Sequence, residues 1–410
     1  MTDVVVRAGR LIDVDAGEVR TGVRLTIRDG LVAAVEPDEG PVPDGATVHD
    51  LTGRTVLPGL LDVHAHMIGE LEDGHGYASL VMRTAAQEAM TGVRNARDTV
   101  LAGVTTVRDV GTFRAFVDCA LRDAIEAGIA IGPRMMCAGA FVTSSGGGGD
   151  VTGLAPDVDA AVPRDLRFGV ANSVVEVRDA VRRILHGGAD FIKVIATGAV
   201  LTEGTTPGAP EFGEDEIRAA VEEAALYGTH VAAHAHGAEG IKRAVRAGVR
   251  SIEHGSLMDD EAIELMASHG TYLVADIYDG DWIAEEGARA GWSAEVLRKN
   301  EETTQAQRDG FEKCVKAGVK IAYGTDSGVY PHRFVGRQFA KMVKHGLTEM
   351  AAIQSATRVA AELMGWSDRV GSLAVGKLAD LVAVDRDPLE DITVLEDIGF
   401  VMKAGEVLKG

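Results

Sequence analysis

Two histidines, His64 and His66, close a short apolar run that follows Leu57-Pro58-Gly59. On a β-strand, residues two apart point to the same side, so both imidazoles can reach one metal ion. Two histidines that alternate through an apolar strand can equally be hydrogen-bonded core residues. The pair alone therefore leaves a metal site and a structural role open, and the residues downstream must decide between them.

Polar residues also end other short apolar runs, and most of these runs are separated by segments with helical spacing. We expect eight strands, at residues 60–66, 104–109, 135–143, 191–195, 231–236, 251–254, 272–276 and 321–326. We expect helices at residues 174–185, 215–227, 241–247, 261–268 and 305–316. This alternation predicts an α/β fold, a (β/α)8 TIM barrel, whose functional residues lie at the C-terminal ends of the strands.

Lys193 lies inside one of the apolar strands, Phe191-Ile192-Lys193-Val194-Ile195. An unpaired ammonium in such a place is costly to desolvate. Three roles stay open: a salt-bridged structural lysine, a neutral lysine that acts as base or nucleophile, and a lysine converted by carbon dioxide to an anionic carbamate. The histidines elsewhere favour the carbamate, because they could bind two cations and a carbamate offers one oxygen to each.

With these residues the chain resembles a binuclear metal-dependent hydrolase of the amidohydrolase superfamily, close to its Xaa-Pro dipeptidase and imidazolonepropionase-like branch. The resemblance runs from about Val4 to the C-terminus. It implies a first metal bound by two histidines and an aspartate, a second metal bound by two histidines, and a carboxylated lysine as bridge. In this chain the first metal would be bound by His64, His66 and Asp326, and the second by His234 and His254. Lys193 would be the bridge. Such donors suit zinc, and they also accept manganese or cobalt.

His236 lies two residues after His234 on the same strand face, so by spacing either could be a ligand. The spacing of the second-metal histidines in the resembling family selects His234 with His254. His236 is then expected to contact the substrate or to support a ligand. Gly255, directly after His254, lets a ligand approach closely.

Asp326 stands in Tyr323-Gly324-Thr325-Asp326-Ser327-Gly328, at the end of the last expected strand. It could be an ordinary helix N-cap or turn aspartate. The resemblance implies instead that Asp326 ligates a metal, takes the proton of the water that becomes a metal-bridging hydroxide, and passes it to the leaving amine. Two cations lower the pKa of that water, and one polarises the scissile carbonyl.

The two ends of the chain alternate as short strands, at residues 4–13, 23–27, 381–384 and 400–403. Asp29-Gly30 and Ala404-Gly405 are turn signals between them. We expect these ends to pair as one small β-sandwich, which the resemblance also implies. The predicted division is a sandwich of residues 1–57 plus 365–410 and a catalytic barrel of residues 58–364.

Composition limits the partners. A formal net charge of −21 over 410 residues argues against nucleic acid, because no basic stripe exists to meet phosphates. Cys119, Cys137 and Cys314 lie far apart without a C-x-x-C motif, which favours a reducing cytoplasm. The sequence has neither a basic-then-apolar leader nor an apolar run of membrane-spanning length. We expect a small-molecule substrate and no membrane partner, and a homo-oligomer stays open.

Loops after the strands should select the substrate. Residues 144–150 form a glycine-rich loop, expected to be mobile, in which Gly148 stands where many dipeptidase-like relatives carry a histidine. A phosphate-cradling role is disfavoured because no Lys-Ser or Lys-Thr follows. The candidate substrate contacts are His75, His236, Tyr278, Tyr330, His332 and Arg333. Arg333 could hold a substrate carboxylate in a bidentate pair.

We therefore expect a metal-dependent hydrolase that cleaves an amide bond of a small carboxylate-bearing substrate, a dipeptide or an N-acyl amino acid. The altered glycine loop favours, as the alternative, a detoxifying hydrolase of carbamates, aryl amides or lactones. A non-catalytic scaffold on the same fold is the alternative from another class. Such scaffolds typically lose ligands, whereas this chain keeps six candidates, and a metal assay would separate the two.

Overall fold

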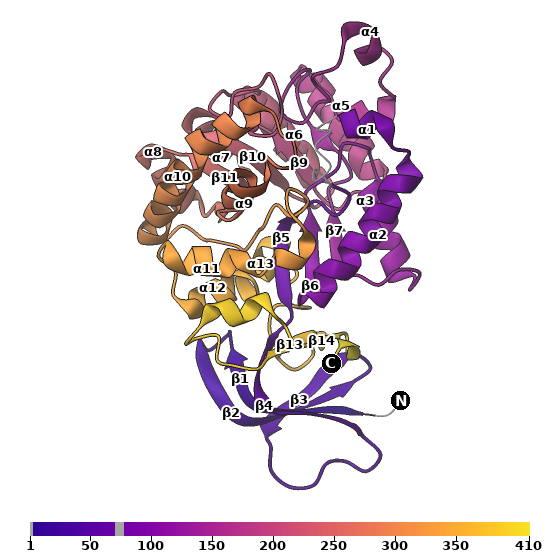
Figure 1. Ribbon diagram of the computed structural model, residues 1–410, viewed down its shortest axis with the longest axis vertical. Helices are drawn as coiled ribbons and strands as arrows, with labels where there is room; N and C mark the ends of the chain where they lie inside the picture. Colours follow the sequence, from indigo (N-terminus) through magenta and orange to yellow (C-terminus); the bar gives the residue numbers. More distant parts are fainter. Residues whose placement is uncertain (1–2, 70–77) are drawn as a thin grey trace. The chain divides into compact units, whose positions relative to one another are not determined.

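The computed structural model describes residues 3–69 and 78–410 (Figure 1). His75, one of the candidate substrate contacts, lies outside the described residues. Helices alternate with parallel and antiparallel sheets, so the chain is an α/β protein as the sequence predicts. It divides into two compact units. Unit 1 comprises Met1–Asp62, Arg97–Val107 and His332–Gly410, and unit 2 comprises Val63–Ala96 and Arg108–Pro331.

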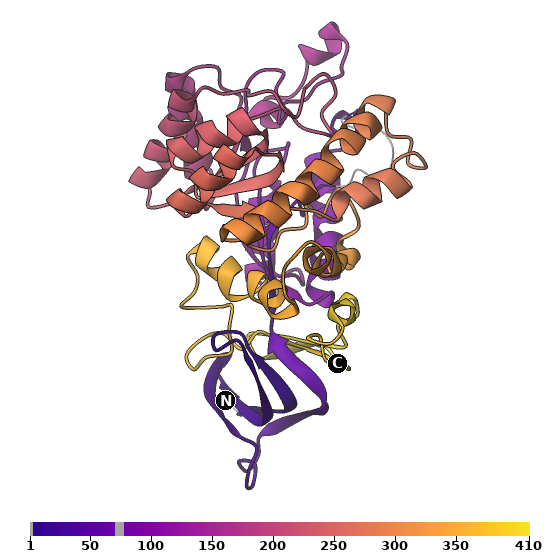
Figure 2. The same cartoon turned by 90° about the vertical axis from the view of Figure 1, so that its left-hand side faces the viewer.

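Unit 1 contains a seven-stranded sheet that takes strands from both ends of the chain, in the order β15-β14-β13-β4-β1-β2-β3. Its strands are β1 (Val4–Asp13), β2 (Glu18–Arg28), β3 (Leu31–Pro37), β4 (Thr47–Pro58), β13 (Leu381–Val384), β14 (Phe400–Lys403) and β15 (Glu406–Lys409). β1 pairs with β4 in parallel, and the other neighbours are antiparallel. Figure 2 shows its N-terminal strands, drawn in indigo, as a strongly curved sheet.

Local sequence explains the tight turns and the core of this sheet. Asp29 and Gly30 adopt φ values of 53° and 78° between β2 and β3, the left-handed geometry that matches the twist of a tight hairpin. Ala404 and Gly405 do the same between β14 and β15, with φ values of 46° and 80°. Apolar side chains of strands from both ends of the chain, such as those of Leu25 and Leu381, form one buried core. The predicted pairing of the two chain ends is therefore present.

Unit 2 contains a parallel five-stranded sheet in the order β12-β11-β10-β9-β8. These strands are β8 (Phe141–Val142), β9 (Ile192–Ile195), β10 (Val231–Gly237), β11 (Ser251–Leu257) and β12 (Tyr272–Val274). A second sheet joins β5 (Leu60–Ala65), β6 (Val104–Asp109) and β7 (Arg134–Cys137), and the boundaries of the two units fall within β5 and β6. Almost every residue of these strands is buried, as in parallel sheets covered on both faces.

Two expected strands differ in detail. The expected strand 135–143 is broken into β7 and β8 around Gly139, whose φ of 72° leaves the extended region. The expected strand 321–326 forms only single bridges, from Ile321 to Leu273 and from Ser327 to Ala65. Its backbone is nevertheless bonded on both sides: Ala322 N donates to Leu273 O at 3.0 Å, and Val63 N donates to Tyr323 O at 2.9 Å. This segment therefore lies between β12 and the end of β5.

Four expected helices agree with α5 (Val174–His186), α6 (Glu214–Leu226), α7 (Ala238–Ala247) and α8 (Asp260–His269) to within a few residues. The fifth, expected at 305–316, is only the second half of α10 (Ala294–Ala317). The first half of α10 buries Lys299, Asn300 and Thr303, so its inner face carries no apolar periodicity that the sequence could reveal.

The remaining helices are mostly short. They are α1 (Ala78–Met82), α2 (Ala85–Leu101), α3 (Val117–Glu126), α4 (Pro156–Asp159), η1 (Arg164–Arg167), α9 (Asp279–Glu286), η2 (His332–Phe334), α11 (Arg337–Lys344), α12 (Glu349–Ser355), α13 (Arg358–Met364) and η3 (Ile392–Glu396). Within residues 3–69 and 78–410, none of the helices combines the length and the apolar character that crossing a membrane requires.

Candidate metal centre

The first group of candidate ligands is His64, His66 and Asp326, all in unit 2. Asp326 Oδ1 lies 3.4 Å from His64 Nε2 and 3.2 Å from His66 Nε2. The backbone explains this convergence, because Asp326 N donates to His64 O at 2.8 Å. Burial raises the pKa of the Asp326 carboxyl. His64 and His66 oppose this effect and hold that pKa well below its ordinary value. Asp326 is therefore ionised, as a metal ligand must be.

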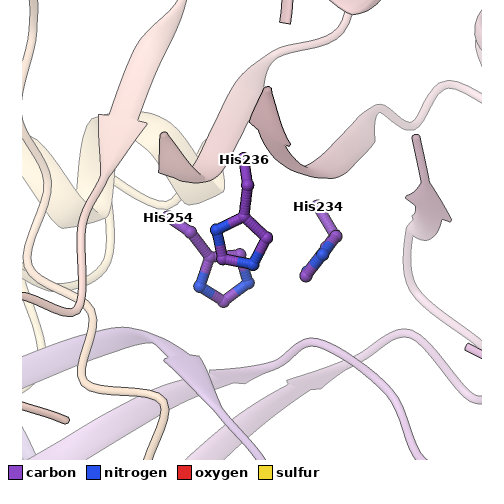
Figure 3. A group of neighbouring side chains, drawn as sticks. All are labelled: His234, His236 and His254. Carbon is purple, nitrogen blue, oxygen red and sulfur yellow. The ribbon is translucent and has the colours of Figure 1, made fainter. Parts of the chain in front are cut away.

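The second group is His234 and His236 on β10 and His254 on β11, drawn in Figure 3. One nitrogen of each imidazole lies within 4.8 Å of the other two, and all three residues are buried. Burial lowers the pKa of His234 well below its ordinary value, and the neighbouring imidazoles lower it further. Burial and His254 likewise lower the pKa of His236 to about 3. Both side chains are therefore neutral, the form in which imidazole binds metals.

The two groups of candidate ligands share His254 and so form one cluster. His254 also lies within 4.8 Å of His64 and Asp326, measured between potential ligand atoms. Lys193, on β9, lines the same cavity as His234 and His254 and is only 2% exposed. Burial lowers the pKa of the Lys193 ammonium to about 8, although neighbouring carboxylates oppose the effect. The structure thus brings together all six residues for which the sequence predicts metal binding.

Two of these residues have strained backbones. His254 has φ of 68° and Asp326 has φ of 55°, in the left-handed region that residues with a Cβ rarely occupy. Such conformations persist where the surrounding structure over-determines them, and they cluster at functional sites. Here both belong to the candidate ligand set, which favours a functional role for the cluster over a purely structural one.

His64 is held by a buried ionic relay that the sequence did not reveal. Its Nδ1 donates to Glu253 Oε2 at 2.8 Å, and Arg108 Nη2 donates to Glu253 Oε1 at 2.7 Å. Arg108 and Glu253 are fully buried. Burial raises the pKa of Glu253, but Arg108 and His64 lower that pKa far below its ordinary value. Because an ionised carboxylate only accepts, Nδ1 carries the proton and leaves Nε2 as the ligand atom.

The other imidazoles are also oriented by their second nitrogen. His254 Nδ1 donates to Asp276 Oδ2 at 2.8 Å, and Gln307 Nε2 donates to Asp276 Oδ1 at 2.8 Å. His66 Nδ1 donates to the carbonyl oxygen of Gly111 at 2.7 Å. Partners of this kind fix the tautomer and the ring orientation of metal-binding histidines. The sequence offered one signal for them, a lone charged residue inside an apolar run, as at Arg108 and Glu253.

A cavity in unit 2 opens onto the cluster. Its described lining includes five of the six candidate ligands, namely His66, Lys193, His234, His254 and Asp326, and also His236. Apolar side chains line another part of the wall: Ile68, Leu80, Phe113, Phe141, Ile195, Val200 and Leu201. A largely apolar cavity with a few convergent polar groups is the usual form of a small-molecule site.

The other predicted substrate contacts that the structure describes are not part of the described cavity lining. Tyr278 is buried and packs its ring edge-on against Tyr330 at 5.1 Å between ring centroids, and neither is part of the described cavity lining. His332 belongs to unit 1, where its Nδ1 is 2.9 Å from Thr99 Oγ1. Arg333, also in unit 1, is exposed. Of the mouth residues predicted from sequence and described by the structure, only His236 lines this cavity.

The sequence predicts that the glycine-rich loop is mobile. In the structure, hydrogen bonds to side chains hold its backbone instead. Gly148 N donates to Glu211 Oε2 at 2.8 Å, and Thr202 Oγ1 donates to Gly148 O at 2.6 Å. Gly149 N donates to Thr143 Oγ1 at 3.2 Å. A Cβ atom added at Gly148 would lie 3.1 Å from a methyl group of Ile195, which is tight. The loop backbone is therefore a packed part of the cavity wall.

Comparison with known proteins decides the family. The sequence profile described as the amidohydrolase family matches residues 55–408. The chain belongs to the amidohydrolase family. This amidohydrolase is therefore a hydrolase, and the bond it hydrolyses is an amide.

The amidohydrolase is similar to several characterised proteins. It is 32% identical to an ochratoxinase of Aspergillus niger over 431 aligned positions, covering 99% of this chain and 86% of the relative. A solved structure of an Xaa-Pro dipeptidase with methionine bound in its active site is 39% identical, with a TM-score of 0.94 and complete coverage of both chains. A solved prolidase in complex with N-methylphosphonate-L-proline is 32% identical, with a TM-score of 0.91 and complete coverage of both chains.

Proposed function

We propose that this amidohydrolase is a binuclear metalloenzyme that cleaves an amide bond in a small carboxylate-bearing substrate, a dipeptide or an N-acyl amino acid. The observation that carries the proposal is the cluster of His64, His66, His254 and Asp326 with His234, of which all but His64 line one cavity together with Lys193. The relatives support the substrate class, because one binds methionine in its active site and another binds a phosphonate analogue built on proline.

The donor set fits two divalent cations. His64, His66 and Asp326 would hold the first, and His234 and His254 would hold the second, with His236 beside them as a substrate contact. Neutral imidazoles and an ionised carboxylate in a compact buried site suit zinc best. When bound, such cations would lower the pKa of water toward neutrality and polarise the amide carbonyl.

Lys193 would bridge the two cations as a carbamate. Its amine is fully buried, and burial lowers its pKa to about 8, so the reactive neutral amine is more populated than in an ordinary lysine. Carboxylation would replace the positively charged ammonium of Lys193 by a carbamate anion, which offers two oxygens to the proposed metal ions. A salt-bridged structural role is less favoured, because a permanent positive charge here would repel both bound cations.

Asp326 is the residue we assign to proton transfer. Its carboxylate is ionised, lies beside His64 and His66, and lines the cavity. It would accept a proton from the attacking water and return it to the amide nitrogen as the C–N bond breaks. The hydrogen bond from Asp326 N to His64 O holds its backbone while the proton moves.

We also propose that residues 58–364 close into a (β/α)8 barrel, with a β-sandwich formed by residues 1–57 plus 365–410. Support comes from the backbone hydrogen bonds that continue from β12 through residues 321–327 to β5. The seven-stranded sheet of both chain ends supports the sandwich. A reducing cytoplasm is the compartment that the free cysteines Cys119, Cys137 and Cys314 favour.

A second candidate function is the hydrolysis of aryl amides or carbamates. Phe113, Phe141, Val200 and Leu201 line the cavity and could receive an aromatic group.

Turnover of a substrate panel tests the proposal. Dipeptides and N-acyl amino acids are compared with aryl carbamates, aryl amides and lactones, before and after removal of metals with a chelator. We expect metal-dependent hydrolysis that is fastest for amides with a free carboxylate. Hydrolysis confined to substrates without a carboxylate would replace the proposal by the second candidate.

A further inference from the structure

A substrate carboxylate that enters this cavity needs a cationic partner, because an unpaired charge is costly to remove from water. We infer that Arg83 binds the substrate carboxylate and is thereby a specificity-determining residue of this amidohydrolase. The inference rests on the proposed function and names a binding residue for the substrate class given there.

The composition of the cavity wall selects Arg83. Among the described residues that line the cavity, the lysine and arginine side chains are Lys193 and Arg83 alone. Lys193 is 2% exposed and stands among the candidate metal ligands, where the proposed carbamate would be anionic. Arg83 is half-buried on the same wall. Its planar guanidinium offers the paired donors that a carboxylate accepts in a bidentate arrangement.

The backbone at Arg83 is anchored by a second arginine. Arg83 stands between α1 and α2, and Arg114 Nη2 donates to Arg83 O at 3.1 Å and to Leu80 O at 2.9 Å. Arg114 is itself 8% exposed and is fixed by ion pairs to Glu88 at 2.9 Å and to Asp165 at 2.7 Å. The position of residue 83 on the cavity wall is therefore set before a substrate arrives, which reduces the entropy lost on binding.

Nearby acids already have partners. Glu88 also lines the cavity and accepts from Arg114 Nε at 2.9 Å; burial raises the pKa of Glu88, and the positive charges of Arg114 and Arg83 oppose that effect. Asp276 accepts from His254 and Gln307, and Asp326 lies against His64 and His66. Arg83 and the candidate ligands line the same cavity, so a substrate with its carboxylate at Arg83 would extend from there to the ligands, where its amide must lie.

Arg333, the residue that the sequence suggested for this role, provides a matched control. It is exposed, belongs to unit 1, and places its guanidinium 4.5 Å from the centre of the Phe334 ring. It is not part of the described cavity lining. Replacement of Arg333 removes the same charge from the chain without touching the cavity wall.

Binding of L-methionine and L-methioninol to the metal-loaded, full-length enzyme tests the inference. The two ligands differ only in the carboxylate, which methioninol replaces by a hydroxymethyl group that cannot be hydrolysed. Calorimetry should show that the unaltered enzyme binds methionine about tenfold or more tightly than methioninol, the scale of a hydrogen bond to a charged group. Arg83→Met should abolish this preference, Arg83→Lys should keep part of it, and Arg333→Met should leave it intact.

Three results would overturn the inference: no preference for methionine in the unaltered enzyme, an unchanged preference in Arg83→Met, or an equal loss in Arg333→Met. Circular dichroism and metal content confirm that each variant is folded and loaded. Turnover of N-acyl amino acids is measured separately. A preference that depends on Arg83 without any such turnover would contradict the proposed function alone, and turnover with an unchanged KM in Arg83→Met would contradict the inference alone.

Discussion

His64 in the first group of histidines and His234 and His236 in the second group are held by different kinds of partner. His64 in the first group is oriented by Glu253, whose charge is balanced by the buried Arg108. His234 and His236 in the second group meet neutral oxygens instead, Gly198 O at 3.2 Å and Ser256 Oγ at 2.8 Å. His64 thus depends on a buried charge network, whereas burial and the neighbouring imidazoles keep His234 and His236 neutral. His254, in the same group as these two, is oriented by the Asp276 carboxylate. The two groups should therefore fail differently when a neighbour is removed.

The largest expected effect comes from Asp326, which we propose as ligand and proton carrier in the first group. Asp326→Asn should lower kcat by about a hundredfold or more, the scale for loss of a positioned acid-base group. Asparagine tolerates the left-handed backbone of this position, so the fold should survive. Steady-state kinetics beside circular dichroism checks the prediction. A folded variant with near-normal turnover would require another proton carrier.

We propose that Lys193 bridges the two groups, so its loss should lower the metal content. Lys193→Ala is expected to lose one metal and most of the activity, and a small added carboxylate should partly restore both by occupying the bridge. Lys299→Ala is the matched control, because Lys299 is equally buried but donates to Thr202 O at 2.8 Å away from the ligands. Metal content that is unchanged in Lys193→Ala would return Lys193 to a structural role.

Glu253→Gln should separate the two groups directly. It keeps a side chain of the same shape beside His64 but removes the charge that faces Arg108. Metal affinity of the first group should fall by about tenfold to a hundredfold, as for other partners of metal-binding histidines, while the second group stays loaded. Titration with a competing chelator measures both affinities. Thermal unfolding measures any loss of stability that follows when Arg108 faces an uncharged side chain. An equal loss at both sites would remove the proposed difference between the groups.

Ser256→Ala should have the smallest effect. It removes one neutral hydrogen bond to His236 Nδ1, a contact usually worth about 1 kcal/mol. We expect the second-group metal affinity to change by less than about tenfold. The same chelator titration compares this variant with Glu253→Gln. A loss as large as that of Glu253→Gln would show that the neutral partner of His236 matters as much as the charged partner of His64.

Local sequence pattern was sufficient to select the candidate metal ligands that the structure brings together. Each except Lys193, which lies inside its strand, follows or ends a short apolar run, and parallel strands bring such ends to one edge of a sheet. The partners that orient the ligands were not predictable in this way. Arg108 and Glu253 meet through strands far apart in the chain, and Gln307 reaches Asp276 from the polar inner face of α10. Periodicity reports burial of apolar residues, so it misses a face that buries amides and a lysine.

Substrate contacts were the least predictable part of the site. Tyr278 and Arg333 follow expected strands in sequence, yet the described cavity wall includes neither. Arg83 precedes a helix and resembles an ordinary surface residue in the sequence, and only the contacts of Arg114 place it on that wall. Loop conformation depends on such individual hydrogen bonds, for which the sequence carries no periodic signal.

Metal analysis of the purified enzyme tests the central claim most directly. Protein prepared without chelators is measured for bound divalent ions and for activity in the same sample. The account predicts about two ions per chain, with activity lost on removal of the metals and regained on their return. Full activity at one ion per chain, or without any bound ion, would contradict the binuclear centre.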